Sequence, residues 1–379
     1  MSDPIATEVD LVTLYEIYPK IIEDLFFMDT ALLAHFRAKA LVPFHGGAFM
    51  QNVFSYAPMV VGSYAKGANW NINKRQTLAG TRFEPKYYAA IIPEYEEDIE
   101  VTNKGELAVF KLIDTDLRNG MSSISAATAV AMNNHGQAAV ASTIYGNHPN
   151  DMNGWPEAMN DGVLPGWDGS IFSTYGTATR NGVIGSKLNS SPYWCGGTDG
   201  STGLITYPKM NTTYLQCSRG KQQPNLGVGN KSVIGFIEDR IQPQQRFAQE
   251  QDPYWGVSGL KMKNAIIMHD DYFPSVIDGV NDPDLGNYLV GDISYTAPST
   301  IPSGSNFPAS CTLKAGEVFA WFNTDKWLFR ISDSKKYGYG ASGFVPAQMN
   351  SRVVCVIRAA INLECLAPWA NKQLLGIGG

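Results

Sequence analysis

Residues 103–136 read NKGELAVFKLIDTDLRNGMSSISAATAVAMNNHG, and this stretch decides the fold. Apolar and small side chains recur in it at steps of three and four, which places them on one face of an α-helix. These residues are Leu107, Phe110, Ile113, Leu117, Met121, Ile124, Thr128 and Ala131. Asn103 followed by Glu106 has capping-box spacing, while Asn133 and Gly136 supply a stop. The sequence therefore predicts one helix over this stretch.

The predicted helix is unusually long. A helix of about 30 residues would extend about 45 Å, whereas helices in globular proteins average about 11–12 residues. A coiled coil is disfavoured because the heptads are not kept, and a membrane span is disfavoured by polar residues such as Ser122 and Asn134. The pattern favours a long strut inside a mixed fold. Gly120 lies near its middle and is a candidate bend.

Composition limits the function classes. The chain has 379 residues, 44% of them apolar and only 17% charged, with a net charge of −6. A charged fraction below the usual quarter suggests that much of the surface is buried against other molecules, including copies of the chain. The acidic balance argues against a protein that grips nucleic-acid phosphates over a broad face. No apolar run of about 18 residues predicts a membrane span.

The ends and the cysteines carry little targeting or redox information. The first residues are acidic and polar, without the basic start of a signal peptide. Five cysteines form no CxxC pair and no zinc-ligand spacing, so we expect reduced thiols. They are Cys195, Cys217, Cys311, Cys355 and Cys365.

Two extended parts precede the helix. Residues 1–43 form an arm with a strong apolar face, and a second short helix is expected to start near residue 29 or 30. This arm must dock on another surface, because an isolated short helix is marginal in water. Residues 44–101 are β-rich: FMQNVFSY and MVVGSY lead out, and FEPKYYAAIIPEYEEDIEV leads back. A two-stranded projection of this kind is marginal alone and is expected to rest on a neighbouring subunit.

These two parts supply the candidate contacts between subunits. They are Lys66, Trp70, Lys74 and Arg75 at the tip of the projection, and Leu11, Ile21 and Phe26 in the arm. The basic residues among them could meet nucleic acid, but three over this length are ordinary for an exposed ribbon. Contact with acidic residues of a neighbour is the favoured interpretation.

The chain after the helix is irregular and then returns to β-structure. Residues 137–320 are loop-rich, with a short helix expected at 155–160, a strand and then a helix capped by Ser232, and a strand at 264–269. The end contains a strand pair bending at 323–325 and a strand of unusual length closed by Pro368. Trp321, Trp327 and Trp369 in this part are expected mainly in the core.

Sequence motifs for chemistry are weak. Residues 338–343 fit GxGxxG, but Pro346 and a strand follow where a dinucleotide site needs a helix. Residues 227–232 resemble part of a P-loop, with Asn225 and Asn230 where glycines are required. His269 and Asp271 could begin a metal site, yet no second histidine supports it. We therefore expect no enzyme activity, cofactor or metal.

The order of elements resembles the HK97-like major capsid proteins of tailed bacteriophages. Local strings agree: KQQP at 221–224 before a strand and helix, GLKMKN at 259–264, FNT at 322–324 before Trp327, and NLECLAP at 362–368. The resemblance implies an α+β fold with an N-terminal arm (1–43), an E-loop hairpin with flanking P-domain strands (44–101), a spine helix (102–136), an A-domain (137–320) and closing P-domain strands with a C-terminal return (321–379). The helix is then expected to pack its apolar face on the strand around 353–365.

The same resemblance implies a structural role. The protein would assemble as hexamers and pentamers into an icosahedral head, made in the host cytoplasm and found in the virion, that encloses double-stranded DNA without reading its sequence. No charged helical segment precedes the arm in this sequence, so, unless such a segment is removed from the protein, the resemblance implies a separate scaffolding protein, a portal and, where the shell carries them, decoration proteins. The family's Lys–Asn crosslink cannot be assigned, although Lys66, Lys74 or Lys86 could be a donor by position.

Two other functions remain open from the residues. A glycan-binding or tail-associated module would stack sugars on Trp155, Trp167 and Trp194 in the aromatic-rich loops. A metal hydrolase would use His269 and Asp271.

Overall fold

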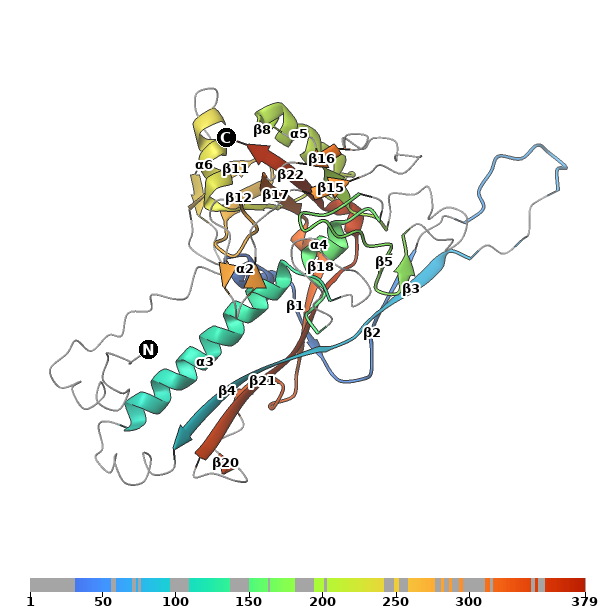
Figure 1. The fold of residues 1–379 in the computed structure, drawn as a ribbon. Helices are drawn as coiled ribbons and strands as arrows, with labels where there is room; N and C mark the ends of the chain where they lie inside the picture. Colours follow the sequence, from blue (N-terminus) through green and yellow to red (C-terminus); the bar gives the residue numbers. More distant parts are fainter. Residues whose placement is uncertain are drawn as a thin grey trace. The chain divides into compact units, whose positions relative to one another are not determined.

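A computed structural model gives the structure of most of the chain (Figure 1). It describes residues 31–55, 59–69, 73, 76–95, 109–136, 150–162, 164–180, 194–200, 203–241, 249–251, 258–276, 281–282, 286–287, 293–295, 311–313, 316–341, 345–346 and 352–378. The described chain forms two compact units, each built from discontinuous segments. The first contains 87–127 and 332–360, and the second contains 29–86, 128–331 and 361–379. Helix α3 (Val109–Met132) and strand β21 (Arg352–Cys365) contribute residues to both.

The first unit is a helix packed on a sheet. Strand β21 pairs here with β4 (Lys86–Tyr95), β19 (Gly338–Ala341) and β20 (Val345–Pro346). A small core of Ile92, Ile124, Cys355 and Ile357 joins strands and helix, with Leu117 packed against it. This confirms the prediction that the helix packs its apolar face on the long closing strand.

Among the residues whose burial is described, helix α3 differs from the predicted buried face at Met121. It ends at Met132, directly before the predicted stop, while 103–108 lie outside the described residues. Met121 is 48% exposed, so its assignment to the buried face is wrong. Gly120 is buried instead: a Cβ there would lie 2.9 Å from Ile92 Cδ1 and 3.1 Å from Ile357 Cδ1. The glycine therefore permits close packing, and the helix continues through it.

The second unit contains a mixed eight-stranded sheet. Parallel pairing joins β12 to β9 and β22 to both β7 and β8, and the other pairs are antiparallel. The strand order is β10 (Gln249–Gln251), β11 (Ser258–Met262), β12 (Ala265–His269), β9 (Leu226–Gly229), β17 (Glu317–Phe322), β22 (Lys372–Gly378) and β7 (Gly197–Asp199), with β8 (Gly203–Leu204) beside β22. Helices α5 (Tyr207–Gln216) and α6 (Lys231–Ile241) contribute Met210, Tyr214, Val233 and Ile237 to a core shared with Phe319 and Trp321.

Other elements of this unit hold the second half of β21. Strand β18 (Trp327–Ser332) pairs antiparallel with it from Trp327↔Cys365 to Ile331↔Ile361, and β1 (Leu41–Phe44) lies beside β18. The remaining elements are α4 (Trp155–Met159), β5 (Thr174–Tyr175), β6 (Ala178–Thr179), β13 (Asn281–Asp282), β14 (Gly286–Asn287), β15 (Ile293–Tyr295), β16 (Cys311–Leu313), η3 (Thr324–Lys326) and η4 (Pro368–Ala370).

Several local predictions can be checked against these bounds. The short helix at 155–160, the strand at 264–269, the bend at 323–325 and the end of the long strand before Pro368 are confirmed. Ser232 is not a cap, because helix α6 begins one residue earlier, at Lys231. Trp321 and Trp327 are buried as expected, whereas Trp369 is half-buried with the Arg219 guanidinium 4.7 Å from its ring centroid.

Helix α2 (Ala31–Lys39) begins where the sequence predicted a short helix, and a distant side chain fixes its start. The backbone N–H of Leu32 donates to the Asp270 carboxylate at 2.7 Å, across 238 residues of sequence. A carboxylate at this position satisfies a free helix N–H and interacts favourably with the helix dipole. Phe36 of the same helix packs edge-on against Phe322 and Trp327.

The glycine motifs serve packing. Gly338 and Gly340 lie in strand β19 rather than in a turn that opens a helix. In β9, a Cβ on Gly227 would approach the rings of Phe319 and Trp321 to 2.8 Å, so this glycine makes room for aromatic side chains. Within the described part of the chain, no helix is long and apolar enough to cross a membrane.

Candidate functional site

A two-stranded ribbon in the second unit is the strongest candidate site. Strand β2 (Met50–Ser55) pairs antiparallel with β3 (Leu78–Phe83), from Met50↔Phe83 to Ser55↔Leu78. The predicted return strand is therefore wrong in position: the chain returns through β3, and β4 pairs with β21 instead. Residues 59–64, expected to extend the outgoing strand, contain no strand. Alternate residues of the ribbon face inward and outward, as the pleat requires.

The outer face and tip of the ribbon expose apolar side chains. Val53 is 65% exposed and Leu78 is 56% exposed on the paired strands. Beyond β2, exposure continues through an apolar run: Met59, Val60, Val61 and Tyr64. Val61 reaches 89%. Contiguous exposed apolar surface of this kind marks an interaction site, because leaving it in water is unfavourable.

Most predicted contact residues cannot be compared with this surface. Lys66 is exposed in a turn closed by the Ala68 N–H to Ala65 carbonyl hydrogen bond. Trp70, Lys74 and Arg75 at the tip lie outside the described residues, as do Leu11, Ile21 and Phe26 in the arm. These contacts stay predictions. Sequence reasoning named the charged tip and missed the apolar run at 59–64, although that run was visible as MVVGSY.

Aromatic contacts fix the root of the ribbon, defined here as Met50–Phe54 with Ala79–Phe83. The Phe54 ring stacks on Trp194 with centroids 4.2 Å apart and planes 1° from parallel. Phe83 meets Tyr175 edge-on at 5.1 Å. Offset and edge-on aromatic pairs contribute about 0.5–1.5 kcal/mol beyond the burial of their area. The ribbon therefore leaves its subunit from a fixed platform.

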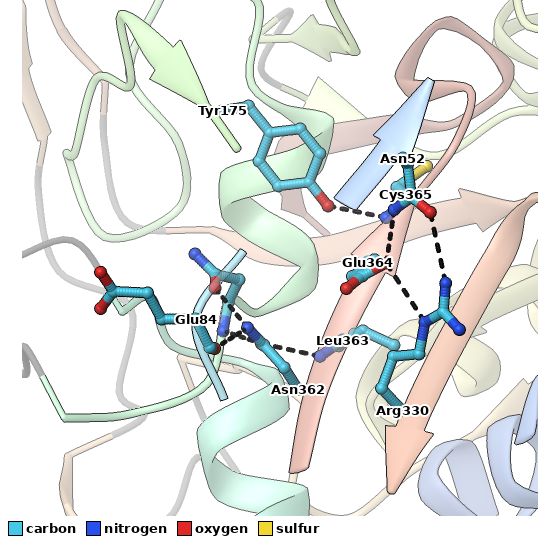
Figure 2. Close-up of polar contacts among 9 residues, drawn as sticks. Asn52, Glu84, Tyr175, Arg330, Asn362, Leu363, Glu364 and Cys365 are labelled. Atoms are coloured by element: carbon cyan, nitrogen blue, oxygen red, sulfur yellow. Dashed lines mark hydrogen bonds and ion pairs between the residues drawn. The ribbon is translucent and has the colours of Figure 1, made fainter. Parts of the chain in front are cut away.

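A buried carboxylate holds the same root (Figure 2). Glu364 of β21 is fully buried and accepts a hydrogen bond from Asn52 Nδ2 at 2.5 Å. Arg330 Nε lies 3.5 Å from the same oxygen, and Arg330 Nη2 donates to Asn52 Oδ1 at 3.3 Å. Burial raises the pKa of Glu364, while Asn52 and Arg330 act in the opposite direction. Strand β2 is thus tied to β18 and β21 by one polar ring.

Neighbouring residues of β21 extend this network. Asn362 Nδ2 donates to the Glu84 carbonyl at 2.7 Å and to Asn153 Oδ1 at 2.8 Å. The Cys365 N–H donates to Tyr175 Oη at 2.7 Å, and burial is the largest cause of the raised pKa of Tyr175 (Figure 2). Three residues near the end of one strand, Asn362, Glu364 and Cys365, therefore organise the base of the ribbon. The signal in the sequence was Asn362 and Glu364 interrupting an otherwise apolar strand.

Among the described residues, the features expected of the two alternative functions are not found. Trp155, Trp167 and Trp194 are at most 2% exposed, so none presents a ring face to a sugar. Trp155 and Trp167 donate their indole N–H groups to Asn133, and Trp155 stacks on Phe273. Asp271 pairs with Lys231 at 3.0 Å. No cluster of three metal-ligating side chains occurs within the described ranges. Cys195, Cys217, Cys355 and Cys365 are free thiols.

Comparison with known proteins identifies the fold. No protein-family model and no curated protein matches the chain. Solved structures do match: the cyanophage A-1(L) capsid at a TM-score of 0.59 and 12% identity, covering 95% of this chain and 96% of that chain. The capsid of a native GTA particle matches at 0.57 and 9%, covering 96% of each chain. The holo-SrpI encapsulin complex from Synechococcus elongatus PCC 7942 matches at 0.55 and 7%, covering 97% and 95%.

These likenesses extend over nearly the whole of each chain. The protein therefore has the HK97-like capsid fold, and the α+β class predicted from the sequence is confirmed.

Proposed function

We propose that this protein is the major capsid protein of a tailed bacteriophage, a non-enzymatic subunit that self-assembles into an icosahedral shell around packaged double-stranded DNA. The observation that carries the proposal is the ribbon, whose root is anchored in its own subunit and whose outer face and tip expose apolar residues. A projecting apolar surface is unfavourable in an isolated molecule and favourable when it covers another copy.

The ribbon suits repeated contacts between copies. Its apolar residues and the tip residues Lys66, Trp70, Lys74 and Arg75 would lie on a neighbouring subunit, as would the arm residues Leu11, Ile21 and Phe26. Many modest contacts repeated by symmetry give a stable shell, because each engaged contact raises the effective concentration for the next. In the proposed shell, the copies form hexamers and pentamers.

The proposed partners follow from that role. A separate scaffolding protein and a portal would take part in assembly in the host cytoplasm, decoration proteins could bind the finished virion, and the DNA would be enclosed without sequence-specific contacts. The net charge of −6 is consistent with a shell wall that does not hold the incoming phosphates strongly.

The test is assembly by a variant that lacks only the ribbon tip. Replacing residues 59–74 by a short glycine linker leaves β2 and β3 in place, whereas a deletion of 64–82 would remove most of β3. Electron microscopy of the wild type, expressed with its scaffold, should show closed shells, and the tip-deleted variant should stay unassembled with an unchanged circular dichroism spectrum. Shells of normal size from the variant would contradict the role of the ribbon.

The contents of the particles test the second half of the proposal. One solved structure with this fold is an encapsulin complex, so the fold alone does not select a phage head. Particles isolated from a natural source should contain double-stranded DNA protected from nuclease. Shells that enclose protein and no DNA would contradict the proposed role in a phage.

A further inference from the structure

Asn52 of the ribbon forms hydrogen bonds to two charged side chains, Glu364 and Arg330. Both polar groups of Asn52 are used: the amide donates to Glu364 Oε2, and the carbonyl accepts from Arg330 Nη2. Arg330 lies 3.5 Å from the same Glu364 oxygen, so the three side chains close a ring across β2, β18 and β21. The ring lies beside the Phe54–Trp194 stack, two residues along the same face of β2.

We propose that Asn52, Glu364 and Arg330 form a latch that holds the ribbon on its own subunit and loosens when Glu364 is ionised. A role for the latch in shell assembly rests on the proposed function, whereas the latch itself is a property of the single subunit. Asn52 is a positioning residue here, since it fixes the direction in which the exposed apolar tip leaves the molecule.

The physical reason is the cost of burying charge. With the ribbon docked, Glu364 has no exposed surface. If the root lifts, Asn52 and the inner face of the ribbon leave and water reaches the carboxylate, which favours its charged form. Docking therefore has two opposing effects on Glu364: burial disfavours the charged form, and the Asn52 hydrogen bond favours it. Burial is the larger cause, so the pKa of docked Glu364 is raised above its ordinary value of 4.5.

The sign of the pH effect follows by linkage. A carboxyl group whose pKa is higher in the docked state binds its proton more tightly there, so protonation stabilises docking. The latch should be tightest below the ordinary value of 4.5 and should lose strength as pH rises through the raised pKa. Acidification therefore tightens the root, and raising the pH loosens it.

The other titratable groups beside Glu364 are Arg330 on β18, Tyr175 on β5 and Cys365 on β21. Burial raises the pKa of Tyr175 on β5 and that of Cys365 on β21, the latter to about 12, which keeps both neutral. Among these described groups, Glu364 is the carboxylic acid, and burial raises its pKa.

Hydrogen exchange of the unassembled full chain tests the latch. Protection factors for amides in β2 and β3, corrected for intrinsic exchange rates, should be several-fold higher below pH 4.5, the ordinary pKa of a glutamate, than at about pH 8. In Glu364→Gln, which cannot ionise, they should be equal at the two pH values. A pH difference in this variant as large as in the wild type would overturn the proposal. Protection of β12 reports whether each protein is folded.

Asn52→Ala provides a second variant if Glu364→Gln fails to fold. Loss of the hydrogen bond should lower protection in β2 and β3 by about tenfold. Gln51→Ala is the matched control, because Gln51 lies next along the strand on the exposed face. Equal protection in the two alanine variants would overturn the proposal. Since these measurements need no shells, failure of the latch and failure of the assembly function are distinguishable.

Discussion

The two ends of strand β21 differ in how their side chains are buried. Over residues 352–360, in the first unit, buried positions alternate with half-buried or exposed ones until the last pair. Over 361–365, in the second unit, every residue is buried, including Asn362 and Glu364. The first end packs one face on a helix, which apolar side chains alone can do. The second end is covered on both faces, so its polar residues need internal partners.

Helix α3 repeats this contrast. Between 116 and 127 it keeps an exposed polar side that includes Arg118, Asn119 and Ser123. Between 128 and 132 every residue is buried. Small residues dominate that end, where Ala129 and Ala131 allow close approach on all sides. The amphipathic pattern thus holds only where the helix has one covered face.

Asn362→Ala should give the largest effect that distinguishes the two ends of β21. It removes hydrogen bonds to Glu84 and Asn153, and leaves buried polar groups without partners. We expect a loss of about 3 kcal/mol in the free energy of unfolding. Val354→Ala, in the half-buried part of the first end, should cost no more than about 1 kcal/mol. Urea unfolding checks both, and equal losses would show that the two ends do not differ.

Gly120→Leu should be the next most destabilising change. Its Cβ would already lie 2.9 Å from Ile92 Cδ1, so a leucine would overpack the first unit and cost about 2 kcal/mol. Gly120→Ala should lie within about 1 kcal/mol of the wild type, because the gain in helix propensity offsets a small shift of two methyl groups. Thermal unfolding of the pair checks this. A strongly stabilising leucine would mean that the helix and strands do not approach so closely.

Tyr175→Phe should have a smaller effect at the second end. The ring contacts with Phe83 and Trp194 remain, and only the acceptor of the Cys365 N–H is lost. We expect a cost of about 1–1.5 kcal/mol. Tyr87→Phe in the first unit, where the ring is 66% exposed, should be nearly neutral. The denaturant midpoints of the two variants measure the difference in their stability. Equal midpoints would show that the Tyr175 hydroxyl does not accept the Cys365 N–H hydrogen bond.

Met121→Ser should have the smallest effect. The sequence pattern places Met121 on the buried face, whereas the structure leaves it 48% exposed. We expect a change within about 0.5 kcal/mol. Unfolding by circular dichroism is sufficient to measure it. A cost as large as that of Gly120→Leu would show that Met121 lies on the buried face, and that the helix is rotated relative to the structure described here.

The elements were predictable wherever one periodicity governed a segment. The long helix, its stop before Asn133, the long closing strand and the bend at 323–325 follow from spacing and turn residues alone. The ribbon was predicted as a projection, but its return strand was misplaced, because LAGTRF looks like a loop and KYYAAIIPEY looks like the better strand. In the structure, strand β4 pairs with β21 instead, and local strand propensity does not show which strand is the partner.

The candidate site was only partly predictable. The charged tip was visible in the sequence, whereas the root was not, since it joins Asn52, Arg330 and Glu364 across as many as 312 residues. The cap of helix α2 by Asp270 is equally distant in sequence. A polar residue in an apolar strand signals a buried partner, but the sequence does not say which partner.

The sequence by itself determined the α+β class, the order of elements and the face that helix α3 turns to the strands, because backbone periodicity and side-chain polarity act over a few neighbouring residues. Only the tertiary structure decided that Gly120 rather than Met121 belongs to that face, that β3 closes the ribbon, and that Glu364 is buried beside Asn52 and Arg330. These outcomes depend on contacts between residues that are far apart in the sequence. The packing around Gly120 and the burial of Glu364 arise from such contacts, so neighbouring residues in the sequence do not determine them.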